Sequence, residues 1–142
     1  MILSDAQARQ TIDTVLALAS ADQVRVNLGG GRRANTRFAL NSVTTCGDTA
    51  DLTVAVTACY GRRHATATTR QTDRESLQAV VERAEALARV APEDSEHMPE
   101  LGPQDYLDTD PWRESTAAAT PTRRAEAALE AVQAAEAHDL TS

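Results

Sequence analysis

The sequence predicts an α+β domain, and three patterns in its 142 residues support that class. A helical apolar stripe lies near the start of the chain, and a stronger one occupies residues 72–91. Between them, residues 23–70 alternate apolar and polar side chains with the period of two that marks half-buried strands. This order indicates an antiparallel meander of about four strands flanked by helices.

The first helix is predicted over residues 5–20, because Ser4 and Gln7 form a capping-box pattern just before the apolar stripe. The strands that follow are expected to be separated by glycine-containing turns, since glycine permits a tight reversal. The predicted strands are 23–28, 34–45, 52–60 and 63–70, with turns at Gly29–Gly31, Cys46–Asp48 and Gly61-Arg62.

The second helix is predicted to begin at a capping box that runs from Thr72 to Glu75 and to end before Pro92. Residues 92–119 lose all periodicity and contain four prolines and eight acidic residues, which predicts an extended acidic connector. Its isolated apolar residues are expected to anchor it to the domain surface; these are Met98, Leu101, Tyr106, Leu107 and Trp112.

A third helix is predicted after Thr120-Pro121, a favourable helix start. Its apolar face is mostly alanine, with Leu129 and Val132. We therefore expect one α+β domain over residues 1–115 and, over residues 116–142, a connector helix that leads towards a further domain.

The overall charge excludes several classes of protein. The chain has a net charge of −7, and its first 70 residues are basic while the rest are acidic. An acidic surface is a poor binder of nucleic acid, because phosphate neutralisation needs basic groups. No apolar run approaches the roughly 20 residues that span a bilayer, and no basic-then-apolar leader opens the chain. We expect a soluble, cytoplasmic protein without membrane or direct nucleic-acid partners.

Residues for catalysis or metal binding are scarce. The three histidines lack zinc-site spacing, and no nucleophile motif is present. Cys59 is predicted to lie opposite His64 across the Gly61-Arg62 turn. This pair supplies only two potential ligands, whereas a zinc site needs three or four. Cys46 and Cys59 are expected on different faces, and therefore as free thiols. Gly29–Gly31 is not expected to bind phosphate, since no lysine is present and a strand follows.

Four arginines are candidates for a binding surface. If Gly29–Gly31 and Gly61-Arg62 are both hairpin turns, then Arg32, Arg33, Arg62 and Arg63 lie at one end of the sheet. Such a rim could hold a carboxylate or an acidic protein, which would make the chain a stand-alone interaction module. The alternative interpretations are a solvated rim, or a rim that meets the chain's own acidic connector.

Three segments carry a resemblance to a known family: Thr36–Ser42 on the second predicted strand, Gly61–Ala67 at the last hairpin and Ala84–Asp94 at the exit of the second helix. They resemble the N-terminal domain of the TldD/PmbA family, metallopeptidases also called modulators of DNA gyrase. The order and spacing of these segments resemble the family over about residues 5–115.

The resemblance implies that zinc and the catalytic residues belong to a C-terminal domain, on a His-Glu-x-x-x-His helix with a later Cys that these 142 residues do not contain. No catalytic or metal-binding residue is therefore carried over, and this chain alone is not expected to be an enzyme. The parent would be the zinc peptidase or its metal-free partner type. The domain would pack against the C-terminal domain and a homologous subunit, in a homo- or heterodimer. It would help to enclose a cleft for an unfolded peptide, with Arg37 and Asn41 as candidate wall residues.

Overall fold

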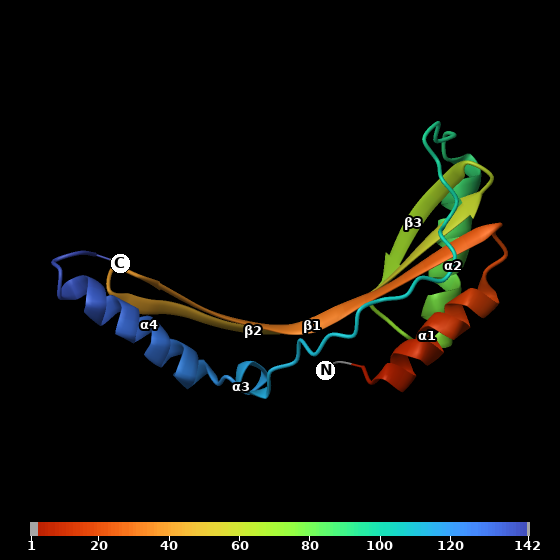
Figure 1. Cartoon of the computed structure of the whole chain (residues 1–142). Coiled ribbons are helices and arrows are strands. Elements are labelled where there is room, and N and C mark those ends of the chain that lie inside the picture. The colour runs from red at the N-terminus through yellow and green to blue at the C-terminus, as the bar shows by residue number, and fades with distance from the viewer. Residues whose placement is uncertain (1–2, 142) are drawn as a thin grey trace. The chain divides into compact units, whose positions relative to one another are not determined.

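A computed structural model describes residues 3–141. It contains three strands and four helices, which confirms the α+β class and corrects the expected strand number (Figure 1). The chain forms two compact units, of which unit 1 holds residues up to 31 and 50–104, and unit 2 holds residues 32–49 and those from 105 on. The elements are α1 (Asp5–Leu18), β1 (Gln23–Ala39), β2 (Ser42–Tyr60), β3 (Arg63–Thr69), α2 (Arg74–Val90), α3 (Glu114–Ala117) and α4 (Pro121–Glu136).

The sheet is antiparallel in the order β1-β2-β3, and two of its three expected turns are absent. β1 runs straight through Gly29–Gly31, and β2 runs straight through Cys46–Asp48. Glycine serves a different purpose at Gly30, where a Cβ atom would lie 2.8 Å from the backbone oxygen of Asp51. The missing side chain lets two strands approach closely, so glycine here marks a contact and not a reversal.

The reversal between β1 and β2 lies instead at Leu40-Asn41. Both residues have positive φ angles, 51° and 57°, as the two central residues of a two-residue hairpin turn require. Asn tolerates this conformation, whereas Leu is rarely found in it. The turn between β2 and β3 was predicted correctly, and its Gly61 has a φ of 59°.

Unit 1 contains a hydrophobic core between the sheet and two helices. Alternate residues of β2, Val54, Val56 and Ala58, are fully buried on one face. They pack with Val15 of α1 and with the stripe of α2, so both helices cover the same face of the sheet (Figure 1). The α2 stripe consists of Leu77, Val80, Val81, Ala84 and Ala88.

The helix ends of unit 1 largely follow the capping signals. Ser4 and Gln7 make the full predicted capping box of α1. The N-cap of α2 is Asp73, where Thr72 was expected, because the Asp73 carboxylate accepts from the Ser76 amide. That hydrogen bond lowers the pKa of Asp73. The helix ends at Val90, before Pro92, as expected.

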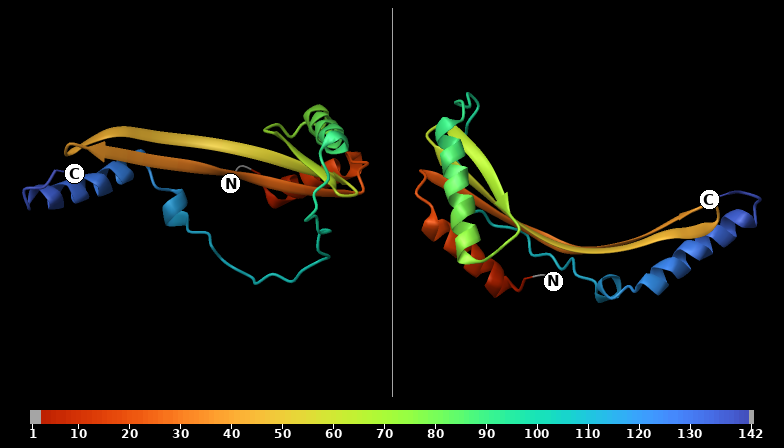
Figure 2. Two further views of the ribbon diagram at one scale, coloured as in Figure 1. Left: turned by 90° about the horizontal axis from the view of Figure 1, so that it is seen from above. Right: turned by 180° about the vertical axis from the view of Figure 1, so that it is seen from behind.

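Unit 2 consists of the β1–β2 ribbon over residues 32–49, with α4 beside it and the extended segment that leads to α4 (Figures 1 and 2). Thr120 caps α4 as expected, and Ala128 and Val132 are buried. The connector predicted over residues 92–119 lacks helix and strand as far as residue 113, as expected, but the short helix α3 interrupts it at Glu114–Ala117. Its apolar residues do not anchor it, however, since Leu101, Tyr106 and Leu107 are 82%, 88% and 92% exposed.

Among residues 3–141, the helices are too short or too polar to cross a membrane. The expected cytoplasmic location and the expected domain boundary at residue 115 stay predictions.

Candidate functional site

Unit 1 has a hollow of about 220 Å³ on the sheet face opposite the helices. The odd-numbered residues of β2 supply its floor, whereas the even-numbered residues enter the core. The first residues of the connector form its other side. Its lining includes Arg25, Thr57, Cys59, His64, His97 and Glu100.

Cys59 lines this hollow and lies directly opposite His64 in the β2–β3 register, as predicted. Its thiol donates a hydrogen bond to the Gly61 carbonyl at 3.3 Å, and its Sγ lies 3.8 Å from Nε2 of His97. Burial raises the pKa of the Cys59 thiol, and the carboxylates of Asp22 and Glu100 raise it further. The thiolate is therefore disfavoured, which argues against a nucleophilic or metal-binding role.

The two histidines near Cys59 do not complete a metal site. The ring centroids of His64 and His97 are 6.2 Å apart, and Nδ1 of His64 lies 3.9 Å from a carboxylate oxygen of Asp94. Within residues 3–141, no group of three or more His, Cys, Asp or Glu side chains could hold a metal ion. The side chains around Cys59 therefore do not form a zinc site.

Arg62 and Arg63 bind the connector of their own chain. The Asp94 amide donates to the Arg62 carbonyl at 2.9 Å, and Nε of Arg62 donates to the Asp94 carbonyl at 3.0 Å. Nη2 of Arg62 also donates to the carbonyl of Ser95. Arg63 donates to the carbonyl of Ala91 at 2.9 Å and forms an ion pair with Glu93 at 3.3 Å. Farther along the connector, Arg25 and Glu100 pair at 3.1 Å. These contacts hold residues 91–100 against the strands of unit 1.

The shared arginine rim was expected from a turn at Gly29–Gly31, and that expectation is wrong. Because β1 continues through these glycines, Arg32 and Arg33 lie along a strand of unit 2, with no hairpin tip beside them. Arg32 forms two hydrogen bonds with the Asp48 carboxylate, at 2.9 and 2.6 Å. They lower the pKa of Asp48 and raise that of Arg32.

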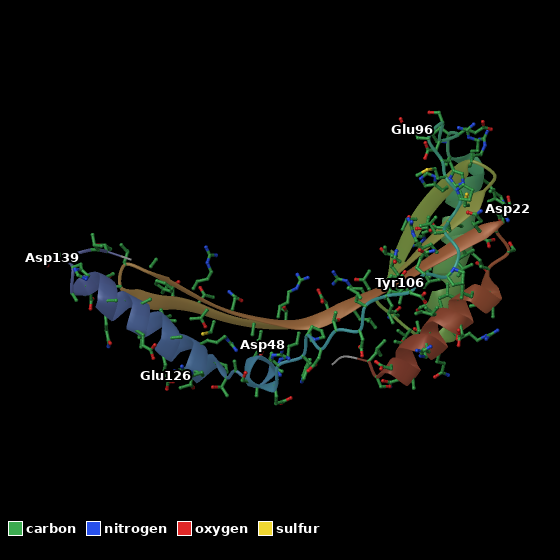
Figure 3. All side chains as sticks on the ribbon, viewed as in Figure 1. Asp22, Asp48, Glu96, Tyr106, Glu126 and Asp139 are labelled. Atoms are coloured by element: carbon green, nitrogen blue, oxygen red, sulfur yellow. The ribbon has the colours of Figure 1, made fainter. Side chains whose placement is uncertain are left out.

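Arg124 of α4 also lies in unit 2, close enough for its charge to lower the pKa of Asp48 further. Its Nη1 donates to the Ala119 carbonyl at 2.8 Å, while its buried Nε and Nη2 have no hydrogen-bond partner in the described structure. Figure 3 shows Asp48 on the ribbon and Glu126 on α4.

Arg37 and Asn41, the two candidate wall residues, both lie near the turn of the β1–β2 hairpin. Arg37 is exposed near the end of β1, and its backbone carbonyl accepts from the Thr44 hydroxyl at 3.2 Å. Asn41 is half-buried in the turn itself. Their predicted role as cleft or partner contacts stays a prediction.

Sequence reasoning missed Glu85, the buried acid of α2. Its carboxylate accepts hydrogen bonds from the amide and hydroxyl of Ser20, at 2.5 and 2.7 Å, and from the amide of Ala21 at 3.1 Å. Burial raises the pKa of Glu85, but these hydrogen bonds outweigh burial and lower it overall. The sequence feature that could have revealed this residue is its position, since Glu85 is an acidic residue within the apolar stripe of α2. Its contacts tie the chain after α1 to α2, which is a structural role.

The comparisons with known proteins agree with the fold. The chain is similar to TldE from Thermococcus kodakarensis, with 14% identity and a TM-score of 0.79 over 94% of this chain. It is also similar to a putative modulator of DNA gyrase from Bacteroides thetaiotaomicron, with 13% identity and a TM-score of 0.67 over 89% of this chain. This chain spans about 30% of the length of each of these two structures. No curated protein matches the sequence.

The sequence was also compared with models of protein families. Residues 25–88 match the model for PmbA/TldA metallopeptidase domain 1. The match begins in β1 and ends in α2, so it covers nearly all of the three-stranded sheet and most of α2. Residues 25–88 of this chain are therefore similar to the first domain of the PmbA/TldA metallopeptidase family, and the resemblance indicated by the sequence is confirmed.

Proposed function

We propose that this chain is the non-catalytic N-terminal domain of a TldD/PmbA-like zinc metallopeptidase. The full-length protein would cleave unfolded peptides in the cytoplasm. In it, this domain packs against the catalytic domain and a second subunit, and it helps to enclose the peptide cleft. The family match over residues 25–88 is the observation that carries the proposal.

The chemistry of the hollow in unit 1 supports a non-catalytic role. The buried Cys59 thiol has a raised pKa, and its hydrogen-bond partners hold it as a neutral donor. The nearby Arg62 and Arg63 are engaged by the connector, which leaves them poorly placed to bind a substrate carboxylate. In this proposal, unit 1 is the folded scaffold, and the catalytic groups come from outside residues 3–141.

The first test is the coding sequence that follows codon 142. A frame that continues into a His-Glu-x-x-x-His helix with a later Cys supports the zinc peptidase, and a continuation without those ligands supports the metal-free partner type. A stop codon directly after Ser142 would overturn the proposal.

The second test uses the purified chain. We expect less than one equivalent of zinc per chain after dialysis, measured by elemental analysis, and no cleavage of an unfolded casein substrate. Stoichiometric, tightly bound zinc or zinc-dependent cleavage by this chain would contradict a non-catalytic role.

A further inference from the structure

Helix α4 lies beside the β1–β2 ribbon of unit 2 and buries little apolar surface there (Figures 1 and 2). Ala128 and Val132 are its buried side chains among those described, and Arg124 and Ala125 in the preceding turn are half-buried. One alanine and one valine remove little apolar surface from water, so apolar burial alone holds the helix weakly. A charged side chain on this same face therefore has a large influence on how firmly α4 is held.

Arg124 is that charged side chain, and its guanidinium is only partly satisfied. Nη1 donates to the Ala119 carbonyl at 2.8 Å, whereas the buried Nε and Nη2 have no hydrogen-bond partner among the described residues. Nε and Nη2 form one edge of the planar guanidinium, the geometry that holds a carboxylate through two parallel hydrogen bonds. A buried charged donor without a partner is costly, so this edge fits one carboxylate.

Asp48 of the ribbon supplies a carboxylate within the same unit. It binds the corresponding edge of Arg32, whose Nε and Nη2 donate to it at 2.9 and 2.6 Å. The positive charge of Arg124 also acts on Asp48 and lowers its pKa. Asp48 therefore interacts with both arginines, although it makes hydrogen bonds with Arg32.

Two acidic residues of α4 are engaged by a different arginine. Glu126 and Glu130 pair with Arg123, at 3.5 and 3.7 Å. The side chains of all three are more than half exposed, so these pairs lie on the solvent side of the helix. The buried edge of Arg124 is thus left for a carboxylate that comes from the ribbon.

Arg32 and Arg124 differ in what they gain from Asp48. The Arg32 side chain is 68% exposed, and an exposed ion pair gains little because water solvates both charges. The unpartnered edge of Arg124 is buried, so a carboxylate there would satisfy donors that water does not reach. Arg124 is therefore an effective competitor for Asp48.

We propose that Asp48 is a latch with two positions. On Arg32, as in this structure, it leaves α4 held by its small apolar face. On Arg124, it fastens α4 to the β1–β2 ribbon by a buried ion pair. Because the two arginines compete for one carboxylate, a carboxylate of another molecule that binds the exposed Arg32 would release Asp48 to Arg124 and tighten α4. The latch uses contacts of unit 2 alone, so it goes beyond the proposed function and does not depend on it.

Hydrogen exchange of residues 121–136, followed by mass spectrometry in the 142-residue chain, measures how firmly α4 is held. Arg32→Gln removes the competing arginine, so Asp48 should move to Arg124 and exchange in α4 should slow about threefold. If the Arg32-Asp48 pair only stabilises the ribbon, the same variant should instead leave exchange in α4 unchanged or speed it. Either of those results would overturn the proposal.

Arg33→Gln is the matched control, because Arg33 is an exposed neighbour of Arg32 on β1 and the substitution removes the same charge. We expect it to leave exchange in α4 unchanged. Equal slowing by the two variants would show that overall charge, and not the release of Asp48, acts on α4. Exchange in α2, which packs in the core of unit 1, serves as the internal reference for folding.

Double variants test whether Asp48 and Arg124 meet directly. Arg32→Gln should have no effect on α4 in a chain that already carries Asp48→Asn or Arg124→Gln, because the new ion pair then lacks one partner. Slowing that persists without the Asp48 carboxylate, or without the Arg124 guanidinium, would contradict the latch.

Discussion

Units 1 and 2 contain similar kinds of elements but bury very different amounts of apolar surface. In unit 1, two helices and three strands enclose ten buried apolar residues in one cluster. In unit 2, the buried apolar residues among those described are Ala128 and Val132 of α4, while Leu40, Tyr106 and Leu107 are exposed. Apolar burial is the main favourable term in folding, so unit 1 can hold its own structure, whereas unit 2 has apolar surface left for association.

The largest expected effect is the loss of a core side chain from unit 1. Leu77 is 1% exposed, and Leu77→Ala should lower the free energy of unfolding by about 3 kcal/mol through lost burial and the cavity left behind. Urea unfolding measures this change. In unit 2, Val132→Ala should cost only about 1 kcal/mol, since α4 has few buried neighbours. Equal losses would show that unit 2 is as well packed as unit 1.

A smaller effect is expected at Glu85, which joins two segments of unit 1. Glu85→Gln should cost about 2 kcal/mol, because the backbone and hydroxyl donors around it lose a charged acceptor. The folded pKa of Glu85 is below its unfolded value. Its contribution is therefore complete above the usual glutamate pKa of about 4.3, and it is lost as the pH falls through the lower folded value.

Chemical unfolding of the parent and of Glu85→Gln at several pH values between about 3 and 7 measures this contribution. The difference in unfolding free energy between the two proteins should shrink on acidification. A difference that is independent of pH would exclude the carboxylate charge as its source.

Two neighbouring glycines test whether β1 is continuous. Gly30→Ala should destabilise the chain by about 2 kcal/mol, because its Cβ would lie 2.8 Å from the Asp51 oxygen. Gly29→Ala is the matched control, with no atom within 4 Å of its Cβ, and should change stability by less than about 0.5 kcal/mol. Thermal unfolding of both variants measures the difference. If both substitutions are equally harmful, residues 29–31 form a turn after all.

The smallest expected effect concerns thiol reactivity, which can be compared between the two units in the folded chain without any change in stability. Cys46 of unit 2 is exposed, whereas Cys59 of unit 1 is buried and has a raised pKa. An aromatic disulfide reagent should therefore label Cys46 roughly a hundredfold faster than Cys59 in the folded chain. Cys46→Ser and Cys59→Ser assign the two phases. Similar rates would mean that Cys59 is not kept buried in the folded chain.

Local signals predicted the helices and one hairpin well. A capping side chain must accept from an amide two or three residues away, so the positions of Ser4 and Thr120 mark helix starts without reference to the rest of the fold. The β2–β3 hairpin was equally predictable, because Gly61 takes the positive φ that its two-residue turn requires. From that turn alone, Cys59 could be placed opposite His64.

The candidate site was less predictable, because its contacts join residues far apart in sequence. Arg62 meets Asp94 and Ser95 only when the connector returns to the β2–β3 turn. His97 approaches Cys59 for the same reason. The sequence offered the interpretation that arginines meet the acidic connector, but not which arginines.

The amino-acid sequence was sufficient to predict the α+β class, the main helices, the last hairpin and the family resemblance of residues 25–88, since these depend on local hydrogen bonding, apolar periodicity and motif order. Long-range packing determines that β1 and β2 continue through their glycines, which local sequence could not show. Glycine permits both a turn and an extended strand, and the close approach of Gly30 to Asp51 settles which one forms. The tertiary structure also decided which apolar side chains stay exposed, because burial depends on the neighbours that long-range packing supplies.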